Sequence, residues 1–199
     1  LITQVTKELD LDPKKFAPKT LRNRISNLKN ECVTASEFEA TAQENNPLEQ
    51  ATARVYSRYQ ERLAVANAYD FDDLIMETVR LLTHNPEIAR NYRARFTHIF
   101  VDEYQDTNPA QYALIRVLAG ADLPEPTGQL TVVGDADQSI YAFRGATVRN
   151  IVEFEKDFPH AQTIVLEQNY RSTQNILSAA NAVIRNNDDR RDKNPVSYT

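Results

Sequence analysis

Cysteine, histidine and glycine are all scarce in this chain of 199 residues. The single cysteine, Cys32, excludes a disulfide framework and a cluster of thiolate metal ligands. The histidines, His84, His98 and His160, are too far apart in the sequence for the spacing of a histidine metal site. No apolar run approaches the ~20 residues of a membrane-spanning helix, and no signal peptide opens the chain. We therefore expect a cytoplasmic protein without a membrane partner.

The shortage of glycine also removes a motif. The four glycines stand at positions 120, 128, 134 and 145, and none begins a loop of the form Gly-x-x-x-x-Gly-Lys-Ser/Thr. That loop holds nucleotide phosphates in a large class of nucleotide-binding domains. The first residue is Leu1 rather than methionine. We interpret the chain as a segment of a larger protein.

Positive charge is concentrated at the start of the chain. The net charge of the whole is −5, which gives no global indication of nucleic-acid binding. Residues 1–30, however, carry seven lysines and arginines against three acidic residues. A solvated helix face explains this excess about as well as a contact with phosphate does.

Helical patterns dominate the first 95 residues. Pro47 opens a long amphipathic stretch, and Ser36 with Glu39 fits a capping box. Asp70 is placed to cap a further helix. Its expected apolar stripe consists of Phe71, Leu74, Ile75, Val79 and Leu82.

The pattern changes after residue 95. Strand-like runs at 97–101, 130–133 and 163–166 alternate with helical stretches. One helix is expected to start at Asn108-Pro109 and to end before Gly120, one is expected over about 148–158, and a last one begins at Ser172. Such alternation predicts an α/β fold, with a parallel sheet and crossover helices after an all-helical segment.

Acidic residues end the first strand-like run. Ile99-Phe100-Val101 stops at Asp102 and Glu103, and side chains at the carboxyl end of a buried strand face the crevice where ligands bind. Because the side chains of neighbouring strand residues face opposite ways, one carboxylate can bind a metal ion while the other binds a water molecule. A solvated acidic turn is the alternative for a bare Asp-Glu pair.

Polar residues also follow the other two runs. Gly134 to Gln138 come after the second, and Glu167 to Arg171 come after the third. Carboxylate, amide and guanidinium groups at one edge of a sheet are the functional groups that phosphoryl transfer requires. Just beyond Gln138, Tyr141 and Phe143 are followed by Arg144; these rings either stack on single-stranded bases or belong to the core.

Three runs resemble helicase motifs. Residues 101–108, 133–146 and 166–172 resemble motifs II, III and IV of the UvrD/PcrA/Rep family of superfamily 1A DNA helicases, in the family's order. Residues 70–74 also resemble a segment that precedes motif II there. The resemblance implies a partial RecA-like sheet and an ATP-dependent, 3′-to-5′ helicase or translocase of replication or repair.

The resemblance also implies roles for residues, with ATP and Mg²⁺ as cofactors. Asp102 would hold Mg²⁺, Glu103 would activate the attacking water, and Gln138 would contact the γ-phosphate. Gln105 and Asp106 would couple the motifs rather than do chemistry. Asp135 and Asp137 would be either supporting groups or turn residues.

For the remaining motif residues, the resemblance implies contacts with base and nucleotide. Tyr141 and Phe143 would stack on single-stranded DNA with Arg144 beside them, although the family commonly has Trp where Phe143 stands. Tyr170 would stack on adenine, and Arg171 would act as an arginine finger.

The same resemblance divides the chain into three parts. Residues 1–69 would be part of domain 1B, residues 70–161 the second half of motor domain 1A, and residues 162–199 the start of domain 2A. Partners would be single-stranded DNA, duplex junctions and repair proteins. Without a phosphate loop we expect the isolated chain to be inactive, and its incomplete sheet could drive a non-native dimer.

Two other interpretations are open. A non-catalytic module could use the basic segment and the aromatics to bind DNA or a protein without ATP. The helicase subunit of a helicase–nuclease complex would carry the same motifs.

Overall fold

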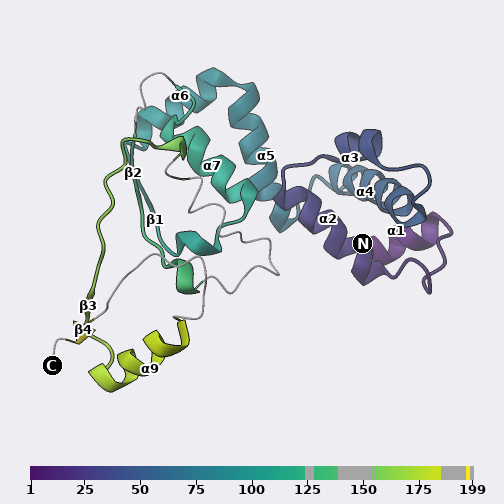
Figure 1. Cartoon of the computed structure of the whole chain (residues 1–199). Coiled ribbons are helices and arrows are strands. Elements are labelled where there is room, and N and C mark those ends of the chain that lie inside the picture. Colours follow the sequence, from purple (N-terminus) through teal and green to yellow (C-terminus); the bar gives the residue numbers. More distant parts are fainter. Residues whose placement is uncertain (124–127, 139–153, 155, 185–195, 198–199) are drawn as a thin grey trace.

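The computed structural model describes residues 1–123, 128–138, 154, 156–184 and 196–197 (Figure 1). Helices fill the chain as far as residue 95: α1 (Ile2–Glu8), α2 (Pro18–Asn30), α3 (Ala35–Thr41), α4 (Pro47–Val65), α5 (Phe71–His84) and α6 (Pro86–Arg95). The remaining elements are β1 (His98–Val101), η1 (Tyr104–Asp106), α7 (Pro109–Ala119), β2 (Gln129–Val132), η2 (Ala136–Gln138), β3 (Gln168–Asn169), α9 (Gln174–Ile184) and β4 (Val196–Ser197).

Helices α1 to α4 form a lobe of their own, on the opposite side of α5 from the sheet (Figure 1). Its core is a cluster of side chains that are at most 4% exposed: Val5, Leu21, Ile25, Ala51, Val55 and Tyr56. Burial of this apolar surface stabilises the lobe. No helix among the described residues is long and apolar enough to span a membrane.

Most helix starts follow from local chemistry. Proline occupies the first turn of α2, α4, α6 and α7, where its missing N–H is not needed. The predicted cap at Asp70 is confirmed, since its side chain accepts from the backbone N–H of Asp73. The predicted capping box at Ser36 is wrong: Thr34 caps α3, and Glu37 is its reciprocal partner. Both pairs have the required spacing, but the helix begins two residues earlier.

The expected apolar stripe of α5 is partly wrong. Val79 and Leu82 are buried as expected, but Phe71 is 88% and Leu74 is 55% exposed. Asp73 and Met76 are buried instead. Helix α5 packs against α2 and α7, and these neighbours select the face that runs through positions 73, 76, 79 and 82.

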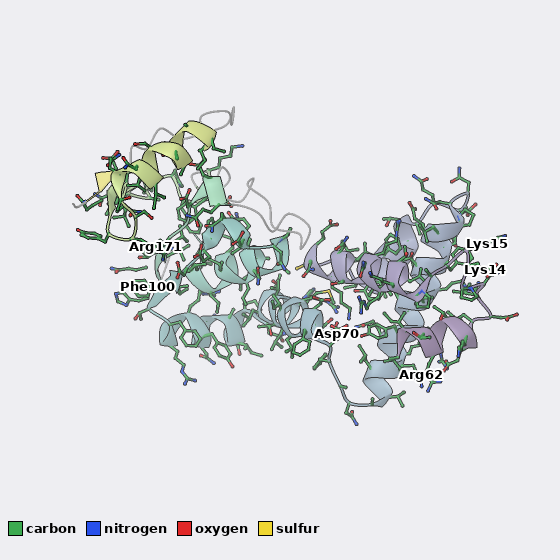
Figure 2. All side chains as sticks on the ribbon, turned by 90° about the horizontal axis from the view of Figure 1, so that it is seen from below. Lys14, Lys15, Arg62, Asp70, Phe100 and Arg171 are labelled. Atoms are coloured by element: carbon green, nitrogen blue, oxygen red, sulfur yellow. The ribbon has the colours of Figure 1, made fainter. Side chains whose placement is uncertain are left out.

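A buried ion cluster joins the helical lobe to α5. The fully buried Lys29, in α2, places its Nζ atom 2.6 Å from Asp70 Oδ2 and 2.7 Å from Asp73 Oδ1. Tyr59 in α4 donates to the same Asp70 oxygen at 2.9 Å. Figure 2 shows Asp70 at the junction between the two parts of the molecule. Lys29 is therefore an internal counter-ion and not a phosphate contact of the basic segment.

The two central strands are parallel, as predicted. β1 pairs with β2 from His98 beside Gln129 to Val101 beside Val132, and α7 lies in the connection between them. Phe100 is 75% exposed, on one face of this sheet (Figure 2). The described chain is thus a mixed α/β structure, mostly helical, with a small parallel sheet.

The third predicted strand is wrong. Residues 163–166 are extended and exposed, with Ile164 at 72% and Leu166 at 79%, and they join neither sheet. The short β3 lies just beyond them and pairs with β4. An apolar run becomes a strand only when a neighbouring strand takes its backbone hydrogen bonds, and none does so within the described residues. The helix expected over 148–158 falls mostly outside those residues.

Candidate nucleotide site at the ends of β1 and β2

The parallel pairing brings two polar loops together. Val133 N–H donates to the Val101 carbonyl at 2.8 Å, and Tyr104 N–H donates to the Val133 carbonyl at 2.9 Å. The chain after β1, which begins with Asp102 and Glu103, is thereby fixed against the chain after β2. This is the arrangement that the strand-end argument predicts.

Glu103 has an unusual backbone. Its φ of 48° and ψ of 43° lie in the left-handed region, which few residues other than glycine adopt. The backbone N–H of Glu103 donates to Asp102 Oδ1 at 2.9 Å, a local bond that supports the turn. The turn directs the chain from β1 into η1. Backbone strain of this kind concentrates at functional sites.

The short helix η1 is anchored by an aromatic side chain. Tyr104 is 3% exposed, and its ring meets Tyr112 edge-on at 6.3 Å and Phe154 at 5.5 Å between centroids. Thr107 Oγ1 donates to the Tyr104 carbonyl at 2.7 Å. The loop that carries Glu103 is therefore packed rather than loosely held.

Gln105 connects the two loops. Its Nε2 atom donates to Glu103 Oε2 at 2.6 Å, and its Oε1 atom accepts from the backbone N–H of Asp135 at 2.9 Å. The residue is 1% exposed. A carboxylate after β1 and the backbone after β2 are thus held by one buried amide.

Asp135 extends this cluster to Gln138. Its Oδ2 atom accepts from Gln138 Nε2 at 2.9 Å, and its Oδ1 atom accepts from the backbone N–H of Asp137 at 3.0 Å. The Gln138 side chain is exposed at the end of the loop. Hydrogen bonds therefore run from Glu103 through Gln105 and Asp135 to Gln138.

The oxygen ligands available suit Mg²⁺ bound together with a phosphate. Asp102 is exposed beside Glu103, and Asp106 Oδ1 is buried without a hydrogen-bond partner among the described residues. No group of three metal-ligating side chains occurs among the described residues. Mg²⁺ commonly uses one or two carboxylates and completes its shell with water and substrate phosphate. The carboxylates present fit that mode of binding.

Other predicted site residues are not part of this cluster. Tyr170, 78% exposed, and Arg171 follow β3, which belongs to the second sheet. Within the described part of the chain, the hydrogen bonds around Glu103 do not include Arg171. Tyr141, Phe143 and Arg144 lie outside the described residues.

The residues that sequence reasoning missed are polar and connect elements. Asn30, at the end of α2, accepts a hydrogen bond at 2.9 Å from Asn108, the cap of α7. The burial of Lys29 had a sequence signal, because Leu21, Ile25 and Lys29 recur at intervals of four residues on one face of α2. The contact of Asn30 had none, since it depends on tertiary placement.

Comparison with known proteins identifies the family. Residues 1–159 match the UvrD/REP helicase N-terminal domain. The chain belongs to the UvrD/REP helicase family. The resemblance to this helicase family is therefore confirmed.

Several curated members of the UvrD/REP family are similar over almost the whole chain. The ATP-dependent DNA helicase UvrD1 of Mycobacterium tuberculosis is 58% identical over 196 residues, which are 97% of this chain and 25% of the relative. UvrD1 of Mycobacterium leprae is 55% identical over 199 residues, covering 97% and 26%. The ATP-dependent DNA helicase PcrA of Bacillus subtilis is 49% identical over 194 residues, covering 98% and 25%. The chain thus spans about a quarter of the length of these relatives.

Proposed function

We propose that this chain is part of an ATP-dependent DNA helicase or translocase of replication or repair, moving 3′ to 5′. The observation that carries the proposal is the hydrogen-bonded cluster of Glu103, Gln105, Asp135 and Gln138 at the ends of two parallel strands. The names of the UvrD1 and PcrA relatives support it, and they favour it over a non-catalytic binding module.

Two residues of the cluster, Glu103 and Gln138, have a task in this proposal, as does the neighbouring Asp102. ATP bound with Mg²⁺ supplies the phosphoryl group and the charge that stabilises its transfer. Asp102 would hold Mg²⁺. Glu103 orients and deprotonates the attacking water, and Gln138 contacts the γ-phosphate.

The remaining motif residues would complete the site in the whole protein. Tyr170 stacks on adenine, and Arg171 neutralises charge on the transferred phosphoryl group. Tyr141 and Phe143 stack on single-stranded DNA, with Arg144 beside them. We assign residues 1–69 to domain 1B, 70–161 to domain 1A and 162–199 to the start of domain 2A.

The Glu103→Gln variant of the full-length protein tests the proposal. Loss of the base should reduce kcat for ATP by about 10²- to 10⁴-fold while single-stranded DNA binding is retained. Glu87→Gln, an exposed change in α6, is the matched control and should leave kcat unchanged. Normal ATP hydrolysis by Glu103→Gln would show that Glu103 is not the base.

A further inference from the structure

The side-chain amide of Gln105 donates a hydrogen bond to one loop and accepts a hydrogen bond from the other. The backbone N–H of Asp135 can only donate a hydrogen bond, and it lies 2.9 Å from Gln105 Oε1. The carboxylate of Glu103 can only accept one when ionised, and its Oε2 atom lies 2.6 Å from Gln105 Nε2. The two partners fix which end of the amide faces which loop.

Few other side chains could satisfy both partners. Glutamate has the length of glutamine, but it brings a negative charge to the Glu103 carboxylate and no donor when ionised. Asparagine has the same groups on a shorter stem. Methionine fills a similar volume without either hydrogen bond. Since Gln105 is 1% exposed, water is not available to replace a lost partner.

Gly134 leaves the space that Gln105 occupies. A Cβ atom at position 134 would lie 2.8 Å from Gln105 Oε1 and 3.3 Å from the backbone nitrogen of Gln105. Real Cβ atoms essentially never approach another heavy atom as closely as 2.8 Å, so the amide would have to move. The absence of a side chain at position 134 is thus a condition for this bridge.

We propose that Gln105 is a positioning residue that orients the Glu103 carboxylate relative to the loop of residues 134–138. This inference rests on the proposed function, in which Glu103 is the base. Gln105 does not touch substrate; it sets the direction of the carboxylate that does. Because the bridge ends on the backbone of Asp135, a displacement of the 134–138 loop moves the amide and, with it, the base.

The bridge also connects Gln138 to Glu103 through a chain of hydrogen bonds. Asp135 receives the Gln105 bridge at its backbone N–H and binds Gln138 Nε2 at 2.9 Å through its carboxylate. The same hydrogen bonds therefore connect Gln138 to the carboxylate of Glu103.

The test compares Gln105→Met and Gln105→Glu with the unaltered full-length protein. Each should lower kcat for DNA-stimulated ATP hydrolysis by about 10- to 100-fold, the usual effect of removing a group that orients a functional ligand. KM for ATP and the affinity for single-stranded DNA should stay close to their original values. A residue needed only for folding would change all of these together, along with the melting temperature.

Gln50→Met is the matched control. Gln50 also bridges two groups through its amide, donating to the carbonyls of Ala42 and Gln43, but it lies in the helical lobe. Its kcat should be unchanged. Gly134→Ala should lower kcat by displacing Gln105, and it should have a much smaller effect when Gln105 is already alanine.

The possible outcomes separate the two proposals. If Glu103→Gln abolishes hydrolysis while both Gln105 variants behave like Gln50→Met, the positioning role is overturned and the proposed function stands. If Glu103→Gln hydrolyses ATP normally, both fail, because there is no base for Gln105 to orient. If Gly134→Ala lowers kcat by the same factor in the unaltered protein and in the Gln105→Ala variant, the bridge is also overturned.

Discussion

Lys29 is a fully buried lysine with two carboxylates as partners. Its Nζ atom contacts Asp70 and Asp73, and it lies 5.0 Å from the centre of the Tyr59 ring. Burial raises the pKa of Tyr59, as does its hydrogen bond to Asp70, so the hydroxyl remains a donor. Removal of one member would leave the others buried without a partner, which is costly.

Replacing Lys29 by methionine should destabilise the chain by about 3–5 kcal/mol, because two carboxylates would lose their buried counter-charge. Urea unfolding followed by circular dichroism measures the change. The control is Lys19→Met in the same helix, whose exposed side chain should change the unfolding free energy by less than about 0.5 kcal/mol. Equal stability of the two variants would mean that the ion cluster contributes little.

At the scale of the element, the two acidic capping boxes differ in what surrounds them. Thr34 and Glu37 start α3 at the surface, where Thr34 holds the pKa of Glu37 below its ordinary value through hydrogen bonds. Asp70 starts α5 and also accepts from Lys29 and Tyr59. One cap serves its own helix, and the other also fixes α2 and α4.

Thr34→Ala should therefore cost about 1 kcal/mol, the usual value of a lost cap. Asp70→Ala should cost more than Thr34→Ala, since it removes the cap and two further hydrogen bonds. Asp70→Asn separates the contributions, because it keeps an oxygen for the cap but loses the charge that faces Lys29. Chemical unfolding of the three variants gives the order, and a smaller loss for Asp70→Ala than for Thr34→Ala would contradict it.

Elements whose ends are marked by local chemistry were predicted well from sequence. Helix α4 begins at Pro47, and α7 runs from the cap Asn108 to Gly120, whose φ of 71° is easy only for glycine. The prediction of a strand at 163–166 was wrong, because a strand forms only by pairing with a segment that is distant in the sequence. The predicted buried face of α5 was partly wrong for the same reason, since the neighbouring helices decide which side of α5 is buried.

The candidate site was predictable in part. Asp102, Glu103 and Gln138 follow strands, and the parallel pairing gathers strand ends at one edge, so their proximity follows from the pattern. The bridge through Gln105 does not follow, because it depends on the close approach of Gly134. The separation of Arg171 from this edge follows from the third strand not joining the sheet.

At the scale of the whole molecule, the absent phosphate loop has a direct consequence. We expect the isolated chain to show no ATP turnover above buffer when mixed with Mg²⁺ and single-stranded DNA, because no Gly-x-x-x-x-Gly-Lys-Ser/Thr loop is present to hold the nucleotide. A coupled assay for released phosphate measures this. Clear turnover that disappears in the Glu103→Gln variant would contradict the expectation.

The junction between the helical lobe and α5 should weaken in acid. Burial by itself raises the pKa of Asp70, but hydrogen bonds from Lys29, from the Asp73 backbone and from Tyr59 bring it below its ordinary value of 3.8. A carboxyl group with a lowered pKa in the fold contributes stability above its unfolded pKa, and this is lost as pH falls through the folded value. Asp72 acts in the opposite sense, since burial raises its pKa and protonation then favours the fold.

We therefore expect the melting temperature to fall below about pH 4, and to fall less steeply in Asp70→Asn, which has no charge to lose. Melting curves of the two proteins between neutral and acid pH give the comparison. Asp10→Asn, a change at an exposed position, is the control and should retain the full acid dependence. Identical pH profiles for Asp70→Asn and the unaltered chain would exclude Asp70 as the source.

The exposed, extended run at residues 163–166 should be a site of proteolytic cleavage. A protease binds its target in an extended form, and here Leu166 is 79% exposed outside any sheet, whereas apolar residues such as Leu21 and Val55 are buried. Brief digestion with chymotrypsin should cut after Leu166 before it cuts within α1 to α7. Mass spectrometry would then find α9 on the shorter piece that this cut releases.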